Sequence, residues 1–401
     1  MMENILLLTN IYPTEDPKYP GTKICHFFTK EWQGMGYNVR VVHYESCFPQ
    51  LYYKIGGLFR ERIMAKTGSI VDMSIPREPK RYEVDGIKVL RVPLKKFIPH
   101  GSVPKNSVKK GVEVTVSFLQ DDGFTPDVIT AHFFFPQAEF LYKLKQAYPN
   151  ARTCMVMHSN GESIPSYYKK GYKPLMESID VWGFRSKSFK EQFESLYGKK
   201  NNEFLCYSGI PAEYIQPTER DFSKGVSRFT FLGSLFKLKN VNVTLLALSQ
   251  VYNNEDYSFD IIGDGAELDF LKGLAKELHQ ENHVVFHGRQ PRDKAQEIMS
   301  KADCFIMVST REAYGLVYLE AMAKGLIPIA TTGQGFDGII ENGENGFLCE
   351  SENVEALASI LRHIKGLPIE ELQRISKNAF ETAKELTDEK AADKYIKSIL
   401  Q

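Results

Sequence analysis

Two glutamates, Glu312 and Glu320, lie on either side of the start of a predicted helix, and their type and spacing are suited to binding a ligand. Glu320 shares a helical face with Leu316 and Ala323, and a carboxylate on an inward face needs hydrogen-bond donors such as the hydroxyls of a diol. Gly315 and Leu316 begin the same helix, whose free N–H groups and dipole could hold an anion.

Each glutamate also has a purely structural explanation. Glu312 could complement the positive end of the helix, and Glu320 stands four residues before Lys324, which is a common surface pair. Spacing alone leaves both explanations open.

Three further kinds of residue extend the possible site. Lys237 and Lys239 follow the first predicted strand of the C-terminal half, where they could meet a phosphorylated ligand, although single lysines there are usually exposed to solvent. His158 follows a predicted strand in HSNGES, yet a lone histidine is more often structural. Gly21 could let the main chain approach a ligand, or it could be an ordinary turn glycine. In combination, the lysines, the helix start and Glu320 indicate a nucleoside diphosphate site.

A strand, a helix and a second strand must position the two glutamates. The pattern predicts them at 304–308, 315–324 and 327–331, with a polar loop between the first strand and the helix. This is a βαβ unit, so the loop lies at the carboxyl end of a parallel sheet, where open α/β folds bind ligands.

The same alternation of strands and helices continues through both halves of the chain. In the C-terminal half, strands are predicted at 228–232, 258–262 and 284–286 and helices at 241–252, 267–279 and 295–300. In the N-terminal half, strands are predicted at 4–8, 37–43, 127–131, 153–157, 179–184 and 203–206, and helices at 23–36, 136–147 and 188–197. Residues 388–401 are predicted to form a final helix. The polar segment 209–227, with two prolines, is the predicted boundary.

Composition limits the classes of protein. The 401 residues predict two domains, and 50 basic against 50 acidic side chains give no bias toward nucleic acid. The 6 cysteines are far apart, which predicts reduced thiols in a cytoplasmic protein. No basic leader precedes the first apolar run, and no run is long enough to cross a membrane.

One basic segment, residues 88–110, could meet an anionic membrane surface. From Gly86 to Val112 there is no acidic residue, and the lysines and arginine there are interleaved with Leu94, Phe97 and Ile98. Most charge runs are only solvated faces, so peripheral membrane association is one of two open interpretations.

The motifs as a set resemble the retaining glycosyltransferases of family 4. The resemblance is carried by Glu312-x7-Glu320, by the following EAMAKGLIPIATTGQG and NGFL, and by FLGSLFKLKNV, IIGDGAEL, VVFHGR and SGIPAEYIQP. It is specific in the C-terminal half and loose in the N-terminal half. It implies an α/β fold of GT-B type, with two doubly wound Rossmann-like domains facing a central cleft. The implied domains are 1–215 for the acceptor, 216–386 for the nucleotide sugar, and a helix at 387–401 that crosses back to the first domain.

The resemblance also implies roles for individual residues. Glu320 would hold the ribose, Glu312 would contact the sugar near the reacting carbon, and His158 would stand across the cleft near the same sugar. The remaining donor-binding positions would be Lys239 and Lys237 on the diphosphate, the main chain at Gly315, Leu316 and Val317, Arg289 near the base, and Gly21. The donor would be a UDP-sugar or GDP-sugar, the acceptor a glycan or lipid-linked glycan, and no other cofactor would be needed.

Two features depart from this pattern, and a third bears on the mechanism. The family usually has arginine after the glycine of the phosphate loop, where this chain has Ser234, so a bidentate donor to the diphosphate is lost. The usual N-terminal glycine pair is reduced to Gly21-Thr22. No Asp-x-Asp occurs in the chain, which argues against a metal-clamped diphosphate.

Other activities are compatible with the same residues. A nucleotide-sugar epimerase or a phosphorylase could use this architecture, and a two-domain sugar-binding protein could close without chemistry. The run Gly333-x-Gly335-x-x-Gly338 resembles a dinucleotide motif, but it is not followed by a complete βαβ unit with a ribose-binding acid.

Overall fold

The computed structural model describes residues 3–16, 21–51, 77–96, 102–216, 220–253 and 255–401. Over these residues the chain divides into two compact units. The N-terminal unit contains Met1–Arg185, Phe189–Ser208 and Asp388–Gln401, and the C-terminal unit contains Ser186–Ser188 and Gly209–Thr387. The sequence placed its boundaries after residues 215 and 386, whereas the units divide after 208 and 387.

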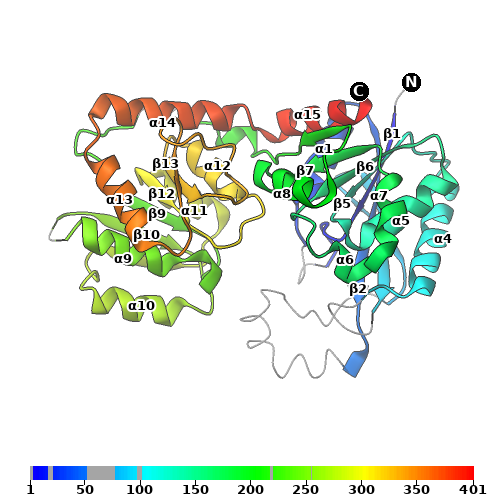
Figure 1. The fold of residues 1–401 in the computed structure, drawn as a ribbon, viewed down its shortest axis with the longest axis horizontal. Coiled ribbons are helices and arrows are strands. Elements are labelled where there is room, and N and C mark those ends of the chain that lie inside the picture. The colour runs from blue at the N-terminus through cyan, green and yellow to red at the C-terminus, as the bar shows by residue number, and fades with distance from the viewer. Residues whose placement is uncertain (1–2, 17–20, 52–76, 97–101, 217–219, 254) are drawn as a thin grey trace. The chain divides into compact units, whose positions relative to one another are not determined.

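The N-terminal unit is built on an eight-stranded sheet in the order β3-β4-β2-β1-β5-β6-β7-β8 (Figure 1). Neighbouring strands are parallel except for the pair β3 and β4. The strands are β1 Asn4–Thr9, β2 Asn38–Cys47, β3 Lys80–Val84, β4 Ile87–Lys95, β5 Val128–His132, β6 Arg152–Met157, β7 Val181–Phe184 and β8 Glu203–Leu205. The helices are α1 Ile24–Gly34, α4 Lys105–Asp121, α5 Phe134–Ala147, α6 Ile164–Tyr168, α7 Tyr172–Glu177, α8 Lys187–Tyr197 and α15 Asp388–Leu400.

Both faces of the central part of this sheet are covered, which explains why the strands β1, β5 and β6 are buried almost throughout. Successive side chains of β1 point to opposite faces. Ile5 belongs to the core on the side of α1 and α15, together with Trp32 and Tyr395. Leu6 belongs to the core on the side of α4 and α5, together with Phe140. The final helix α15 is therefore part of the N-terminal unit, and it packs against α1 (Figure 1).

The C-terminal unit has a parallel six-stranded sheet in the order β11-β10-β9-β12-β13-β14 (Figure 1). The strands are β9 Arg228–Leu232, β10 Ser258–Ile262, β11 Val284–Gly288, β12 Cys304–Ile306, β13 Ile327–Thr331 and β14 Phe347–Cys349. The helices are α9 Val241–Val251, α10 Leu268–Glu277, α11 Arg292–Ser300, α12 Leu316–Met322, α13 Val354–Lys365 and α14 Ile369–Lys384. The predicted α/β fold with two Rossmann-like sheets is thereby confirmed.

The described residues of the basic segment 88–110 are divided between β4 and α4. Lys88 and Arg91 lie on β4, where Arg91 is 3% exposed and its Nη2 lies 2.6 Å from Glu45 Oε2. Lys96, also buried, has its ammonium 4.9 Å from the centre of the Phe135 ring. The exposed lysines of the segment are Lys88 and Lys95 on β4 and Lys105, Lys109 and Lys110 on α4. Phe97 and Ile98 lie outside the described residues.

Two other predictions can be compared with the structure. All 6 cysteines are buried and none is in a disulfide, which confirms that they are free thiols. Within the described residues, no helix is both long and apolar enough to cross a membrane.

Candidate functional site

The loops that follow β9 and β10 pack main chain against main chain at the carboxyl edge of the C-terminal sheet. A Cβ on Gly263 would lie 1.8 Å from Gly233 O, and a Cβ on Gly265 would lie 2.4 Å from Leu235 O. Leu235 N also donates to Asp264 O over 2.9 Å. Only glycine permits this contact, so the predicted phosphate loop has a fixed shape.

Lys239 and Glu312 form an ion pair that joins the loop after β9 to the loop after β12. Lys239 Nζ lies 2.6 Å from Glu312 Oε2, and both side chains are 17% exposed. Two lysines and a glutamate were predicted in these loops, and the structure brings one lysine and the glutamate together. Glu312 is therefore paired with a cation from another loop, and the helix N-terminus is not needed to explain its presence.

Asn240, which the sequence analysis did not single out, connects the same two loops. Its main chain is left-handed with φ of 51°, and its amide donates to Val308 O over 2.8 Å and to Thr310 Oγ1 over 3.0 Å. The position of Asn240 directly before a predicted helix could have indicated this role, because asparagine is common there and tolerates left-handed conformations.

The start of α12 lies beside the loop that holds Glu312. Gly315 has φ of 89°, and a Cβ there would lie 2.6 Å from the Tyr318 ring. Gly335 N donates to Glu312 O over 2.9 Å, so the glycine loop after β13 supports this turn. Leu316 and Val317 are half-buried in the first turn of α12, where main-chain N–H groups have no acceptor within the helix.

Glu320 is buried in α12 and is held by two side chains of α11. It is 8% exposed; Arg292 Nη2 lies 3.0 Å from its Oε1, and Gln296 Nε2 donates to its Oε2. Burial raises the pKa of Glu320, and the charge of Arg292 opposes that rise. An exposed pair with Lys324 is therefore not the explanation for Glu320.

Sequence reasoning missed Arg292 and Gln296. It began the helix at 295, because Arg292, Asp293 and Lys294 are polar and show no apolar rhythm, whereas α11 begins directly after Pro291. Their four-residue spacing places both side chains on one face of a helix. Gln296 lies on the buried face of that helix, and a polar side chain on such a face indicates that it has a polar partner.

Three predicted donor-binding side chains lie at the same sheet edge but are exposed. Ser234 and Lys237 lie in the loop after β9, and Arg289 directly follows β11. Their loops follow strands of the same parallel sheet as the loops of Lys239 and Glu312. Their contacts with a ligand stay predictions.

Gly21 and His158 belong to the N-terminal unit. Gly21 has φ of 68°, and a Cβ there would lie 2.2 Å from Tyr12 O, so a close turn already requires glycine. His158 follows β6, stacks on Phe133 with ring centres 3.8 Å apart, and its Nε2 lies 3.0 Å from His132 Nδ1. The ligand roles of Gly21 and His158 are not tested by these contacts.

Two buried histidines of the N-terminal unit predict a loss of stability in acid. Burial lowers the pKa of His43 to about 4 and that of His132 to about 3, with smaller contributions from Arg91 and Arg185 respectively. The same groups titrate at roughly 6.5 in an unfolded chain. Because the folded pKa is the lower one, the unfolded state takes up protons first as the pH falls, and unfolding becomes easier.

We expect the free energy of unfolding to fall by up to about 1.4 kcal/mol per pH unit for each histidine as the pH drops from about 6 to about 4. Urea denaturation at several pH values measures this slope. His43→Gln removes one of the groups and should make the slope shallower. An unchanged slope in that variant would exclude the contribution of His43.

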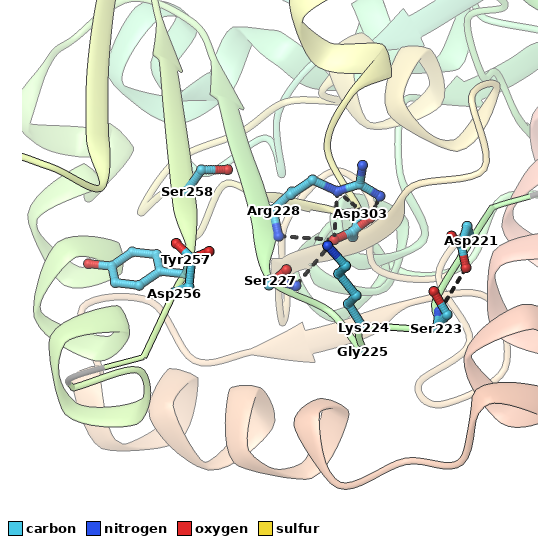
Figure 2. A pocket seen from close by; sticks show the side chains of 10 residues that line it. All are labelled: Asp221, Ser223, Lys224, Gly225, Ser227, Arg228, Asp256, Tyr257, Ser258 and Asp303. Carbon is cyan, nitrogen blue, oxygen red and sulfur yellow. Dashed lines mark hydrogen bonds and ion pairs between the residues drawn. The ribbon is translucent and has the colours of Figure 1, made fainter.

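A pocket lies at the opposite, amino-terminal edge of the C-terminal sheet, and contacts that hold strands together account for its charged residues (Figure 2). Arg228 begins β9, Ser258 begins β10, and Asp303 directly precedes β12. Asp303 is 1% exposed and its carboxylate accepts from Arg228 N over 2.9 Å and from Ser227 N over 3.2 Å. The Arg228 guanidinium pairs with the same carboxylate, with Nη2 2.5 Å from Oδ1. Figure 2 marks this contact with a dashed line. Asp303 thus connects the start of β12 to the start of β9.

Replacing Asp303 with alanine should lower the free energy of unfolding by roughly 2–3 kcal/mol, because two main-chain N–H groups and the half-exposed Arg228 guanidinium lose the buried acceptor they share. Chemical denaturation measures the change. Glu297→Ala is the control, since Glu297 is 51% exposed and pairs only with exposed lysines, and should cost about 1 kcal/mol or less. Similar values for the two variants would show that Asp303 does not have this role.

Comparisons with known proteins first define the class of fold. The structure is similar to the lipopolysaccharide outer core galactosyltransferase WaaB, with a TM-score of 0.69 and 16% identity over 99% of both chains. It is also similar to the Anabaena protein HepE in complex with UDP and glucose, with a TM-score of 0.64 and 17% identity over 99% of both chains. The fold is the GT-B fold, with two Rossmann-like parallel sheets.

The match to a protein family lies within the C-terminal unit. Residues 216–382 match the family of glycosyl transferases group 1. The chain is 35% identical to N-acetyl-alpha-D-glucosaminyl L-malate synthase of Bacillus anthracis, over 34% of this chain and 35% of that protein. It is 28% identical to an uncharacterized glycosyltransferase of Methanocaldococcus jannaschii, over 68% of this chain and 74% of that protein. The chain thus spans about a third of the length of the Bacillus relative.

Proposed function

We propose that the protein is a retaining glycosyltransferase that moves a sugar from a nucleoside diphosphate sugar to a hydroxyl of a glycan or lipid-linked acceptor. The observation that carries the proposal is the arrangement at the carboxyl edge of the C-terminal sheet. There the Lys239–Glu312 pair joins the loops that follow the neighbouring strands β9 and β12, and α12 with Glu320 comes directly after, in a domain that matches glycosyl transferases group 1. Open α/β sheets bind their ligands at this edge.

In this proposal Glu320 binds the ribose of the donor. A carboxylate offers about four acceptor sites on its two oxygens, so hydroxyl groups can be accepted beside Arg292 and Gln296. Those two α11 side chains hold the carboxylate in one orientation before the nucleotide arrives. Arg289, exposed at the end of β11, lies near the base.

The diphosphate is bound by Lys239 and by the main-chain N–H groups at Gly315, Leu316 and Val317. Lys239 is already oriented by Glu312, and its ammonium has three donors, so it can contact a phosphate while it stays near that carboxylate. Lys237 adds a second cation, and Ser234 donates a hydroxyl where the related enzymes usually have arginine. Gly21 lets the main chain of the N-terminal unit approach the donor.

The reaction is a displacement at the anomeric carbon with retention. The bond between that carbon and the diphosphate oxygen breaks, a bond to the acceptor oxygen forms on the same face, and the acceptor proton passes to the leaving diphosphate. Lys239 and the N–H groups of α12 stabilise the charge that develops on the leaving group. Glu312 and His158 contact the sugar, and no metal ion takes part.

The names of relatives indicate the class of acceptor. They include an alpha-monoglucosyldiacylglycerol synthase of Streptococcus pneumoniae and a lipopolysaccharide core biosynthesis glycosyltransferase of Rhizobium meliloti. We propose that the N-terminal unit binds the acceptor. The reaction would take place in the cytoplasm. Peripheral association with an anionic membrane would use the exposed lysines of α4, and it would be excluded if the protein failed to co-sediment with anionic vesicles at low salt.

A screen of UDP-sugars and GDP-sugars for slow release of the nucleoside diphosphate tests the proposal, with and without EDTA. One donor should be hydrolysed at the same rate in both conditions. Tight binding without hydrolysis would indicate a binding protein, and a requirement for inorganic phosphate would indicate a phosphorylase. Interconversion of the sugar while it stays attached to the nucleotide would indicate an epimerase.

A further inference from the structure

Four side chains of the N-terminal unit form a continuous chain of hydrogen bonds that ends at His158. His158 Nε2 lies 3.0 Å from His132 Nδ1, and His132 Nε2 lies 3.1 Å from the hydroxyl of Tyr395. The Tyr395 hydroxyl lies 2.5 Å from Thr130 Oγ1. These residues come from β5, from the residue after β6 and from the C-terminal helix α15, so elements far apart in sequence meet at one histidine.

The inner part of this chain is fully enclosed, whereas His158 is only half-buried. Thr130 and His132 are 0% exposed and Tyr395 is 1% exposed. The Tyr395 ring is held edge-on by Phe28 and Trp32, with ring centres 5.1 Å and 5.0 Å away. Trp32 Nε1 also donates to Ala392 O on α15 over 2.9 Å. The hydroxyl of Tyr395 is therefore fixed in position relative to His132.

Phe133 fixes the other side of His158. It has φ of 69°, a conformation that a bulky residue rarely adopts, and its ring stacks on the imidazole. A strained main chain is maintained only where the surroundings determine it, and such positions cluster at functional sites. The stacking and the contact with His132 together leave the His158 ring one orientation.

The protonation of the two imidazoles makes the chain directional. Burial, with the nearby charge of Arg185, lowers the pKa of His132 to about 3 and keeps that of His158 well below its ordinary value. Each neutral imidazole has one N–H and one lone pair. If Tyr395 donates to His132 Nε2, then His132 Nδ1 donates to His158 Nε2, and the His158 proton sits on Nδ1. If Tyr395 accepts instead, every bond in the chain reverses and Nδ1 of His158 has the lone pair.

We propose that Tyr395 is a positioning residue that, through His132, sets the ring orientation and the tautomer of His158. This inference rests on the proposed function, in which His158 contacts the donor sugar. The C-terminal helix thereby supports the reaction without touching the substrate. The neighbours of metal-bound or catalytic histidines act in the same way, since a hydrogen bond to one ring nitrogen decides which nitrogen has the proton.

The test variant is Tyr395→Phe, which keeps the ring and removes only the hydroxyl. We expect kcat for donor hydrolysis to fall roughly 10–100-fold with little change in KM. In the His158→Ala background the same substitution should change kcat less than about threefold, because coupled residues are not additive. The ¹⁵N chemical shifts of the His158 imidazole should move in Tyr395→Phe, which reports the tautomer directly and needs no turnover.

Tyr44→Phe is the matched control. Tyr44 is 1% exposed, and its hydroxyl lies 2.7 Å from Thr115 Oγ1, so the variant also loses a buried tyrosine–threonine bond in the same unit. It should leave kcat and the His158 shifts unchanged. Equal effects of the two variants, or additivity with His158→Ala, would overturn the proposal. If no nucleotide sugar is turned over but the His158 shifts move only in Tyr395→Phe, the proposed function fails and the positioning role stands.

Discussion

Replacing Glu320 with alanine should weaken the binding of the preferred nucleoside diphosphate sugar by about 100-fold or more. Hydrogen bonds to a charged group contribute about 1.5–3 kcal/mol each, and this carboxylate is proposed to accept the ribose hydroxyls. The substitution also leaves Arg292 and Gln296 without the acceptor they share. Isothermal titration calorimetry with the intact donor measures the dissociation constant.

The ribose assignment has its own control. Glu297→Ala removes an exposed glutamate from α11 and should leave the dissociation constant unchanged. The wild-type protein should bind the ribonucleotide more tightly than its 2′- or 3′-deoxy analogues, and Glu320→Ala should lose that preference. If Glu320→Ala kept both the affinity and the preference, the ribose would have to be bound elsewhere.

Replacing Lys239 with methionine should lower kcat for donor turnover by roughly 100–1,000-fold. The effect should fall mainly on kcat, because the ammonium stabilises charge that develops on the leaving diphosphate in the transition state. Methionine keeps most of the side-chain length but leaves Glu312, which is only 17% exposed, without its cation. Steady-state kinetics on the donor found by the nucleotide-sugar screen measure kcat and KM separately.

Lys272→Met provides the comparison, since Lys272 is exposed on α10 away from the loops of the site. Its kinetics should match the wild type. If Lys239→Met raised KM alone and kept kcat, Lys239 would contribute to ground-state binding only. Values of kcat and KM that both lie within threefold of the wild type would show that Lys239 does not contact the donor.

The sequence predicted the elements of the C-terminal unit more accurately than their side-chain partners. The strands at 228–232, 258–262 and 327–331 have the predicted bounds, because short apolar runs between glycine-containing loops have one plausible assignment. The partners of Glu320 were missed, because a contact between α11 and α12 depends on three-dimensional packing. The local pair with Lys324, four residues away, was the only partner that spacing could offer.

The N-terminal unit was harder to predict for a related reason. The antiparallel pair β3 and β4 was not predicted, since basic residues interrupt the apolar pattern there. Arg91 is buried on β4 because Glu45, on the neighbouring strand β2, supplies its counter-charge. Similarly, His158 was only a lone histidine in the sequence. The residues that fix its position are His132, which is 26 residues away, and Tyr395 on the last helix.

Retention at the anomeric carbon is the central chemical claim, and ¹H NMR of the first sugar product tests it most directly. The protein is incubated with the α-linked nucleotide sugar that it hydrolyses, and spectra are recorded before the released sugar mutarotates. We expect the α anomer to appear first, at the same rate with EDTA, and Lys239→Met to suppress its release. First appearance of the β anomer would show inversion and contradict the proposed mechanism.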